Sequence, residues 1–265
     1  MKNSKRGKNM GRLENKVVII TGALGGQGQV AVRRFVEEGA RVLASDLAPR
    51  ANGEVASLAK QAPAKVAYVG GDVRDAKTVE KIVKAAVKKF GRVDVLYNNH
   101  GLMVGKPFLE TTSEELDNLL AVNLRAPFLL SQAAARVMAK QGGGAIIHNS
   151  SVGGIVGFPT MAAYGASKGG LAQLARSMAS DLAVYGIRVN AICPGVVDTQ
   201  MPQRYLKDNK VEDTAGAFRQ MASMHLLNRL AEPIEIVNVA LFLASDEASY
   251  MTGAVIPVDG GLTAI

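Results

Sequence analysis

The sequence predicts one α/β domain, in which helices cover both faces of a doubly wound parallel sheet of about seven strands. Segments typical of strands alternate with segments of helical periodicity along the whole chain of 265 residues, as in sheets built from strand–helix–strand units. The strand segments, such as VVII at 17–20, are apolar without alternation, which indicates strands covered on both faces. No linker or fixed-period repeat divides the chain, so we expect a single domain.

Each expected strand is a short apolar run, rich in β-branched residues and bounded by turn-forming residues. These runs lie at 16–21, 41–45, 65–70, 93–99, 144–150, 187–194 and 254–261. Segments with helical periodicity lie at 30–39, 54–61, 78–90, 113–140, 162–185 and 233–243. In such a fold, ligands bind where the carboxyl ends of the parallel strands meet.

Local signals support the limits of the helices. Gly39 ends the first helix, and lysines mark the exposed face of the third. Ser113 opens the long fourth helix together with Asp117, one place beyond the usual capping-box spacing, and Pro127 predicts a kink within it. The segment 200–229 is polar and rich in methionine. We expect it to be irregular, with 200–226 acting as a mobile lid over the substrate.

Composition excludes several classes of protein. With 48% hydrophobic residues the chain can bury a large core, but it has no apolar run that could span a membrane or serve as a signal peptide. Its single cysteine, Cys193, cannot form an internal disulfide, which fits a reducing compartment. We therefore expect a cytoplasmic protein with no membrane partner.

The net charge of +8 is concentrated at the amino terminus. Five basic residues precede the first acid, Glu14, which leaves 26 of the 31 basic residues to face 23 acidic ones. We expect residues 1–12 to form a flexible basic arm, residues 13–265 to form the domain, and no nucleic acid to be bound. The five residues are Lys2, Lys5, Arg6, Lys8 and Arg12.

A serine, a tyrosine and a lysine are spaced as a candidate catalytic set. Ser151 lies thirteen residues before Tyr164, and Lys168 lies four residues after it, on the same face of the expected helix. An ammonium beside a phenol favours the phenolate and lowers a tyrosine pKa from about 10 towards neutral. Tyr164 is therefore a candidate general acid or base, with Ser151 on the same substrate oxygen. Taken alone, a tyrosine and lysine at this spacing are also common in ordinary helix packing.

A glycine-rich turn, TGALGGQG at 21–28, follows the first strand. There Gly22 permits a tight turn, Gly26 lets the backbone approach a pyrophosphate, and Gly28 allows close packing of helix on strand. Asp46 ends the second strand, where a carboxylate accepts hydrogen bonds from both ribose hydroxyls of NAD and repels a 2′-phosphate. The nearest cation that follows is Arg50, so we expect NAD to be preferred over NADP. The alternative is that Asp46 only caps the next segment.

Together these motifs resemble the short-chain dehydrogenase/reductase family in its compact single-domain form, which has a Rossmann-type fold. The resemblance covers the chain from Leu13 to its end. It rests on TGALGGQG, Asp72-Val73, NNHG at 98–101, Asn123, Ser151, Tyr164-x-x-x-Lys168, Pro194-Gly195 and Thr199.

The resemblance implies a catalytic role for four residues. Tyr164 would give or take the proton on the substrate oxygen, and Ser151 would orient that oxygen. Lys168 would bind the nicotinamide ribose and lower the tyrosine pKa. Asn123 would hold a water that links Lys168 to solvent, although it could also be an ordinary asparagine facing the interior of its helix. No metal is needed for this chemistry, and His100, His148 and His225 are scattered in the sequence.

The resemblance also implies the cofactor contacts. Asp72 and Val73 would meet the adenine, while Asn98 and Gly101 would line the adenosine side. The turn after the sixth strand would hold the nicotinamide, with Thr199 on its carboxamide. The expected cofactor residues are Gly22, Gly26, Gln27, Gly28, Asp46, Asp72, Val73, Asn98, Gly101, Tyr164, Lys168, Pro194, Gly195, Val197 and Thr199.

The chain departs from the family pattern in three places. His100 stands where the family has alanine, and it either lines the substrate mouth or only accommodates a wider turn. Gly25 and Gln27 replace a small polar residue and an isoleucine in the glycine turn, which affects the phosphate contacts. Ser150 precedes Ser151 and is the second candidate for the catalytic serine.

The substrate pocket is expected among loops beyond the strand ends. Methionines there indicate an apolar, adaptable pocket, although individual members could equally be core or subunit contacts. No charged residue is an obvious substrate anchor, but Arg204 and Lys207 are candidates. The expected substrate residues are Ser151, Gly153, Phe158, Met201 and Tyr205, with Met103, Val104, Met161 and Met221 as further candidates.

The sequence therefore predicts an NAD-dependent alcohol dehydrogenase or ketoreductase that acts on an apolar or cyclic secondary alcohol or ketone. One alternative is a 3-oxoacyl-(acyl-carrier-protein) reductase, which would use NADPH and need a basic patch for its acidic carrier. Another is a non-catalytic dinucleotide sensor, although such proteins generally lose the tyrosine or lysine. The helix at 162–185 carries small residues suited to close packing, and relatives assemble through such helices and the last strand, so we expect a homotetramer.

Overall fold

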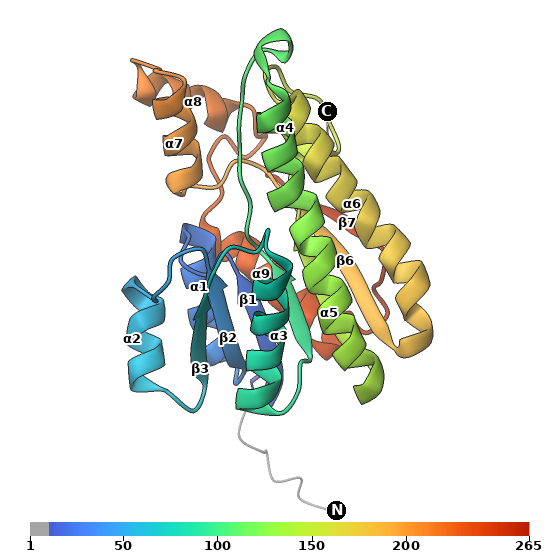
Figure 1. Ribbon diagram of the computed structural model, residues 1–265. Helices are drawn as coiled ribbons and strands as arrows, with labels where there is room; N and C mark the ends of the chain where they lie inside the picture. Colours follow the sequence, from blue (N-terminus) through green and yellow to red (C-terminus); the bar gives the residue numbers. More distant parts are fainter. Residues whose placement is uncertain (1–10, 265) are drawn as a thin grey trace, which may run out of the picture.

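A computed structural model describes residues 11–264 of the protein. One parallel sheet of seven strands has the order β3-β2-β1-β4-β5-β6-β7, which is a Rossmann-type α/β fold and confirms the expected fold class (Figure 1). The strands are β1 (Val17–Thr21), β2 (Arg41–Asp46), β3 (Val66–Gly70), β4 (Val95–Asn98), β5 (Gly144–Asn149), β6 (Ile187–Pro194) and β7 (Val255–Val258).

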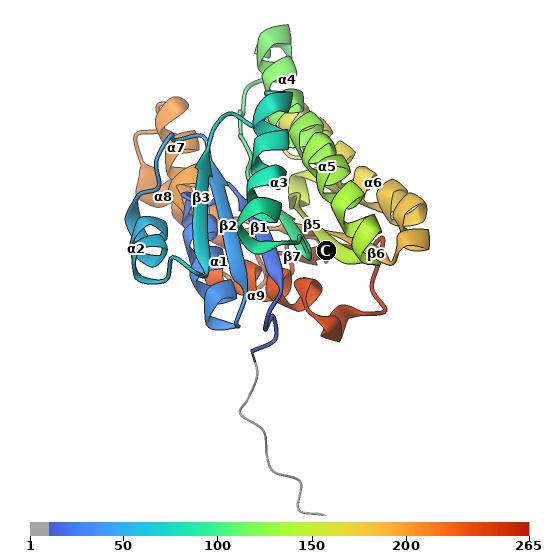
Figure 2. The ribbon, with the colours of Figure 1, turned by 60° about the horizontal axis from the view of Figure 1, so that its bottom comes forward.

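Helices cover both faces of the sheet. α1, α2 and α9 pack on one face, and α3, α5 and α6 pack on the other, as Figure 2 shows. The α-helices are α1 (Gly26–Glu37), α2 (Gly53–Gln61), α3 (Ala76–Phe90), α4 (Ser113–Leu120), α5 (Ala126–Gln141), α6 (Ala162–Leu182), α7 (Gln200–Asp208), α8 (Thr214–Ser223) and α9 (Pro233–Ala244). Among the described residues, no helix is long and apolar enough to cross a membrane.

The continuous apolar runs are explained by this double cover. In β1, Val18 and Ile20 face the core beneath α1 and α9, while Val17 and Ile19 face the core beneath α3 and α5. On the first of these faces the ring of Phe35 stacks on that of Tyr97, with centroids 6.3 Å apart. Both faces of each central strand therefore exclude water, and neither needs polar residues.

The segment expected to be irregular contains two helices, so that expectation is wrong. Thr199 caps α7 by accepting a hydrogen bond from the Met201 N–H, and Asp213 caps α8 through the Gly216 N–H. These helices are short and largely exposed, and α7 buries only Pro202 and Leu206. Their caps supply stability that hydrophobic periodicity does not reveal.

The long helix expected at 113–140 consists of α4 and α5 joined by a π-helical turn, η2 (Ala121–Arg125). Pro127 lies at the second position of α5, where it cannot donate the α-helical hydrogen bond to the carbonyl of Asn123. The irregularity expected at Pro127 therefore begins one turn earlier, around Asn123. The helix is opened by Thr112 and Glu115, which form a capping box, and not by Ser113 with Asp117.

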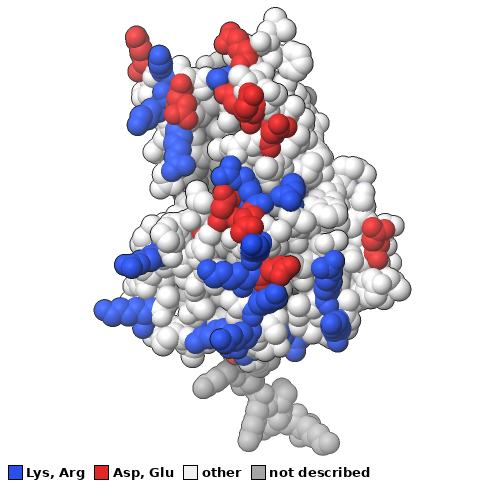
Figure 3. Space-filling model, in the orientation of Figure 1, with Lys and Arg blue, Asp and Glu red and all other residues white. Residues whose placement is uncertain are grey.

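Lysines cover the outer face of α3, and Figure 3 shows this basic area in the lower half of the molecule. Lys77, Lys81, Lys84 and Lys88 line a shallow groove there together with Glu80. The groove runs along the helix.

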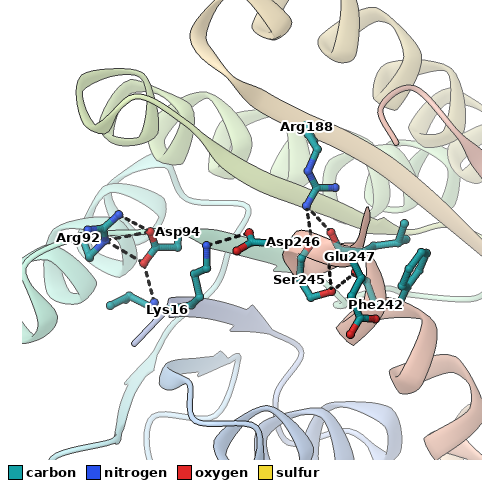
Figure 4. Close-up of polar contacts among 10 residues, drawn as sticks. Lys16, Arg92, Asp94, Arg188, Phe242, Ser245, Asp246 and Glu247 are labelled. Atoms are coloured by element: carbon teal, nitrogen blue, oxygen red, sulfur yellow. Dashed lines mark hydrogen bonds and ion pairs between the residues drawn. The ribbon is translucent and has the colours of Figure 1, made fainter. Parts of the chain in front are cut away.

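Ion pairs close the opposite edge of the sheet, where the strands begin (Figure 4). Lys16 pairs with Asp246, and the Asp94 carboxylate accepts three hydrogen bonds from Arg92 and one from the Val17 N–H. The Arg188 guanidinium donates to the carbonyls at the end of α9. These contacts join the starts of β1, β4 and β6 to the short helix η5 (Asp246–Ala248) and the end of α9.

Arg12 also belongs to the domain, which corrects the expected limit of the flexible arm. Its backbone N–H donates to Glu38 Oε2 at 2.8 Å, and its guanidinium pairs with Glu247. The rest of the expected arm, residues 1–10, lies outside the described residues. The expected division into an arm and a domain is therefore tested only at residues 11 and 12.

Candidate active site

Ser151 and Tyr164 lie side by side beyond the end of β5. Ser151 Oγ accepts a hydrogen bond from the Gly153 N–H at 3.1 Å and caps the short helix η3 (Val152–Gly154). A Cβ placed on Gly153 would lie 3.4 Å from the Tyr164 ring and 3.5 Å from Ser151 Oγ. The glycine therefore leaves space beside the hydroxyl and the ring, where a substrate carbon can be accommodated.

Ser150 is arranged differently from its neighbour. It is buried, and its hydroxyl donates to the backbone carbonyl of Lys168 at 2.7 Å. That bond uses the Ser150 hydroxyl to hold β5 against α6. The geometry favours Ser151 over Ser150 as the serine that meets a substrate.

Lys168 lies one helical turn after Tyr164 on the buried face of α6. Its Nζ donates to the carbonyl of Asn149 at 2.7 Å and would lie 3.2 Å from a Cβ on Gly101. Asn123 Oδ1 would lie 3.5 Å from the same point. The expected residues Gly101, Asn123 and Lys168 thus meet at one place.

The Asn123 side chain fastens the loop after β4 to two helices. Its Oδ1 accepts from the Leu102 N–H, and its amide donates to the Leu102 carbonyl, both at 2.8 Å. The amide also donates to Ser167 Oγ on α6 at 3.0 Å. Because these bonds occupy the side chain, the expected water would have to bind the Asn123 carbonyl, which Pro127 leaves without its α-helical partner.

The pKa of Tyr164 is shifted upwards, whereas its spacing to Lys168 predicts a downward shift. Burial raises the pKa of Tyr164, and its hydrogen bond with Ser151 only partly opposes this. Burial also lowers the pKa of Lys168 to about 8. Desolvation disfavours both charged forms, and the Lys168 ammonium is bonded to the Asn149 carbonyl. In these surroundings burial, and not the charge of Lys168, determines the direction in which the pKa of Tyr164 is shifted.

The start of α1 fits a pyrophosphate. Its cap residue, Gly25, has no side chain to bond the first N–H groups, and the first turn contains no acidic residue. The helix begins at Gly26, four residues earlier than expected, so Gly26, Gln27 and Gly28 present their N–H groups there. A Cβ on Gly28 would lie 2.0 Å from the Gly22 carbonyl oxygen, so a side chain cannot occupy that position.

Asp46 lies beside this turn at the end of β2. One carboxylate oxygen accepts from the Leu24 N–H at 2.8 Å, and the other accepts from the Leu47 N–H at 2.7 Å. Each oxygen keeps a further lone pair that can accept a hydroxyl proton. The carboxylate caps no helix, because α2 begins after Asn52.

Asp72 lies at the end of β3, in an ion pair with Arg74. This partner lowers the pKa of the Asp72 carboxyl. Val73, which follows, is half-buried against the core on the α3 face. Both lie at the carboxyl edge of the sheet, as expected for the adenine side.

The side chain of Asn98 does not line the opening, which corrects one expectation. It is buried, donates to Ser131 Oγ at 3.1 Å and lies 3.2 Å from His148 Nδ1. Asn99 faces the glycine turn in its place, donating to the Gly22 carbonyl at 3.1 Å. Asn149, also missed from the sequence, donates to the side chains of both Asn99 and Gln27.

His100 fills the space between the glycine turn and Lys168. Its Nδ1 lies 2.6 Å from Thr21 Oγ1, and its backbone would touch any Cβ on Gly22. Burial and the charge of Lys168 lower the pKa of His100 to about 4. His148 lies near it on the adjacent strand, and burial lowers the pKa of His148 to about 3. The two imidazoles are therefore neutral near pH 7, which supports a packing role for His100 in a wider turn.

The turn after β6 lies against the glycine turn. The Thr199 methyl group would lie 2.9 Å from a Cβ on Gly26. Pro194 ends β6, the Gly195 N–H donates to the Val258 carbonyl, and Val197 pairs with Ala231. The contact with Gly26 therefore places Thr199, one of the expected nicotinamide residues, beside the start of α1.

Tyr205 brings α7 over the loops that follow β4 and β5. Its ring lies where a Cβ on Gly105 would be, next to Met161, and its hydroxyl is 3.4 Å from Thr160 Oγ1. Of the other expected substrate residues, Gly153 borders Tyr164, Phe158 is half-buried, and Met201 is exposed in the first turn of α7. Met103, Val104 and Met221 are partly buried.

Comparisons with known proteins agree with this arrangement. A family model described as Enoyl-(Acyl carrier protein) reductase matches residues 22–263. An uncharacterized oxidoreductase of Thermotoga maritima is 41% identical over 252 residues, which cover 95% of this chain and 99% of that protein. The 3-oxoacyl-(acyl-carrier-protein) reductase of the same organism is 39% identical, with 95% and 99% covered. The cyclopentanol dehydrogenase of a Comamonas species is 36% identical, with 96% and 100% covered.

A solved structure agrees as well. The crystal structure of levodione reductase superposes with a TM-score of 0.89 at 35% identity, covering 95% of this chain and 99% of that one. The family match, the full-length relatives and the meeting of Ser151, Tyr164 and Lys168 at one site lead to the same assignment. The chain therefore belongs to the short-chain dehydrogenase/reductase family of NAD(P)-dependent oxidoreductases.

Proposed function

We propose that the protein is an NAD-dependent dehydrogenase of apolar secondary alcohols, cyclic ones among them, and that it reduces the corresponding ketones. The observation that carries this proposal is the buried Tyr164 hydroxyl beside Ser151, one helical turn from Lys168. Cyclopentanol dehydrogenase, among the relatives, acts by its name on such an alcohol. The methionines near the site supply adaptable apolar contacts for it.

In the oxidising direction, Tyr164 takes the proton from the substrate hydroxyl while Ser151 hydrogen-bonds the same oxygen. Bound NAD supplies the hydride acceptor. Burial raises the pKa of Tyr164, so the phenolate needs a positive charge close by when the site is loaded. Lys168, one helical turn away on α6, would supply that charge. In the reducing direction Tyr164 returns its proton to the oxygen.

Different residues of the chain would hold different parts of the cofactor. The N–H groups at the start of α1 would hold the pyrophosphate, and Lys168 would bind the nicotinamide ribose. Thr199 would meet the carboxamide, and Asp46 would accept the adenosine ribose hydroxyls. A phosphate on the 2′ position would approach the Asp46 carboxylate, which favours NAD.

We also propose that α7 and α8 form the substrate lid and that four copies assemble through α6 and β7. The loops under α7 contain Gly105, Thr160 and Met161, so motion of this helix would open the site. The assembly is tested by sedimentation velocity, where a homotetramer is expected. A cytoplasmic location stays part of the same proposal.

A second candidate is reduction of a 3-oxoacyl group on an acyl carrier protein. The 39% identical relative and the lysine-covered face of α3 favour it, because the carrier is acidic. Asp46 argues against NADPH, the reductant that this reaction would use. The Tyr164–Lys168 pair argues against a dinucleotide sensor without catalysis.

The test is NADH formation from NAD across linear, cyclic and aromatic secondary alcohols, repeated with NADP. We expect cyclic or other apolar alcohols to react with NAD, and Tyr164→Phe to abolish their turnover. Faster turnover of a 3-oxoacyl carrier substrate with NADPH would establish the second candidate. NADH binding without turnover of any substrate would favour a sensor.

A further inference from the structure

Both ends of the proposed substrate lid are bonded to one turn of the chain, residues 194–199. At its front, α7 begins at Gln200, directly after the turn at 194–199, and Thr199 caps it. At its rear, α8 ends at Ser223, and His225 follows two residues later. His225 is only 4% exposed, so it packs inside the domain although most of the lid does not.

The two nitrogens of His225 reach in opposite directions. Nδ1 lies 2.8 Å from the Met221 carbonyl in the last turns of α8, and Nε2 lies 3.1 Å from the Val196 N–H in the turn after β6. A carbonyl only accepts and an amide N–H only donates, so Nδ1 carries the proton and Nε2 is bare. One neutral tautomer satisfies both bonds.

Close packing keeps the imidazole in this position. A Cβ on Gly195 would lie 2.6 Å from His225 Nε2, so the ring occupies the space of a side chain at 195. The Asn228 N–H donates to the His225 carbonyl at 2.8 Å, and the Leu227 N–H donates to the Gly260 carbonyl at 3.1 Å. The charged group that faces the ring is Asp259, whose carboxylate is bonded to Thr263 and the Gly261 N–H.

The hydrogen bond to His225 holds the backbone of Val196, which also bonds to Ala231. The Val196 carbonyl accepts from the Ala231 N–H at 3.0 Å, and the N–H of Asp198, two residues further on, donates to the Ala231 carbonyl at 2.9 Å. The Val196 N–H has His225 as its acceptor. One of the two backbone hydrogen bonds of Val196 therefore depends on His225, at the rear end of the lid.

We propose that His225 is a positioning residue that couples cofactor binding at the turn 194–199 to the rear helix of the lid, α8. This proposal rests on the proposed function, because it takes that turn as the nicotinamide site. Binding of the cofactor orders Val196, the Val196 N–H holds Nε2, and Nδ1 holds the last turns of α8. By reciprocity, an ordered α8 strengthens cofactor binding.

Two substitutions separate the two bonds. His225→Gln keeps an acceptor near the position of Nε2 and loses the bond to Met221. His225→Asn keeps a donor near the position of Nδ1 and loses the bond to Val196. Gln220→Ala, on the exposed side of α8, serves as the matched control.

The readout is limited trypsin cleavage with and without saturating NADH, followed site by site. Arg219 lies in α8, whereas Arg204 and Lys207 lie in α7, and all three are exposed. In the wild type and in Gln220→Ala, we expect NADH to slow cleavage at all three sites. In both His225 variants, protection at Arg219 should be lost, while protection at Arg204 and Lys207 remains.

NADH affinity supplies a second readout. His225→Asn should weaken NADH binding about tenfold, because a shielded N–H loses its acceptor, while His225→Gln should weaken it only by the factor by which NADH protects Arg219 in the wild type. Equal protection of Arg219 in all variants would refute the coupling. Absence of protection at Arg219 in the wild type, with NADH bound, would refute it even if neither variant folds. Absence of NADH binding to the wild type would instead refute the proposed function, and the coupling with it.

Discussion

Asp46 offers the sharpest test of the cofactor assignment. Asp46→Ala removes the acceptor of the proposed ribose hydroxyl bonds. Hydrogen bonds to a charged group contribute about 1.5 to 3 kcal/mol each, so loss of one such bond weakens NAD binding about 10- to 150-fold. NADP should lose nothing, because its 2′-phosphate no longer meets a carboxylate. The ratio of kcat/KM for NAD to that for NADP should therefore fall at least tenfold.

The structure also predicts a stability cost for the same change. The carboxylate accepts hydrogen bonds from the N–H groups of Leu24 and Leu47, at a net contribution of about 1 kcal/mol each. Asp46→Asn has one carbonyl oxygen, so it can keep one of the two bonds and should cost about half as much. Urea unfolding of both variants measures this difference.

Steady-state kinetics with both cofactors, on a substrate found in the alcohol panel, measures the preference. Glu54→Gln is the control, because it removes one negative charge on α2 where the carboxylate pairs with Arg33 and not with the glycine turn. It should leave the cofactor ratio unchanged. An unchanged ratio in Asp46→Ala, in a folded protein, would refute the reasoning.

Three further predictions concern catalysis, pH and packing. Tyr164→Phe removes only the hydroxyl, so turnover should fall at least about 100-fold while the NADH dissociation constant, from fluorescence titration, changes little; loss of NADH binding would mean a structural role. Burial holds the pKa of His148 at about 3, below its ordinary 6.5, so its contribution to stability is complete above pH 6.5 and is lost as the pH falls towards 3. The contribution of His148 to the unfolding free energy should therefore drop by about 1.4 kcal/mol per pH unit below 6.5, in addition to that of His100, so His148→Gln should reduce the slope by this amount; an unchanged slope in His148→Gln would contradict this. Phe35→Ala removes a fully buried ring stacked on Tyr97 and should cost about 3 to 5 kcal/mol in urea unfolding; a loss below about 1 kcal/mol would contradict the packing.

The sequence predicts the strands well because these depend on local patterns. Apolar runs mark the seven strands, and residues just beyond them converge since the carboxyl ends of parallel strands share an edge. What the patterns do not contain is the direction of each side chain at that edge. Asn98 and Asn99 point to opposite faces, and only the register of β4 against β1 determines which one meets the glycine turn.

The remaining differences come from tertiary surroundings. The Tyr164 pKa depends on how completely its ring is buried and on the partner of the Lys168 ammonium, and neither follows from a spacing of four residues. The helices α7 and α8 depend on caps and on a few buried contacts. Thr112 with Glu115 is the exception, since the capping box could have been found from its spacing in the sequence.

The ion pairs at the amino edge of the sheet have a consequence for synthesis of the protein. Arg12 and Lys16 lie at the entrance to β1, but their partners, Glu247 and Asp246, come 235 and 230 residues later in the chain. The helix α9, which covers α1 and the central strands, precedes these partners only slightly. A nascent or truncated chain that stops before α9 therefore exposes the apolar surface of α1, and the ribosome must pass Ala244 before this face of the sheet is covered.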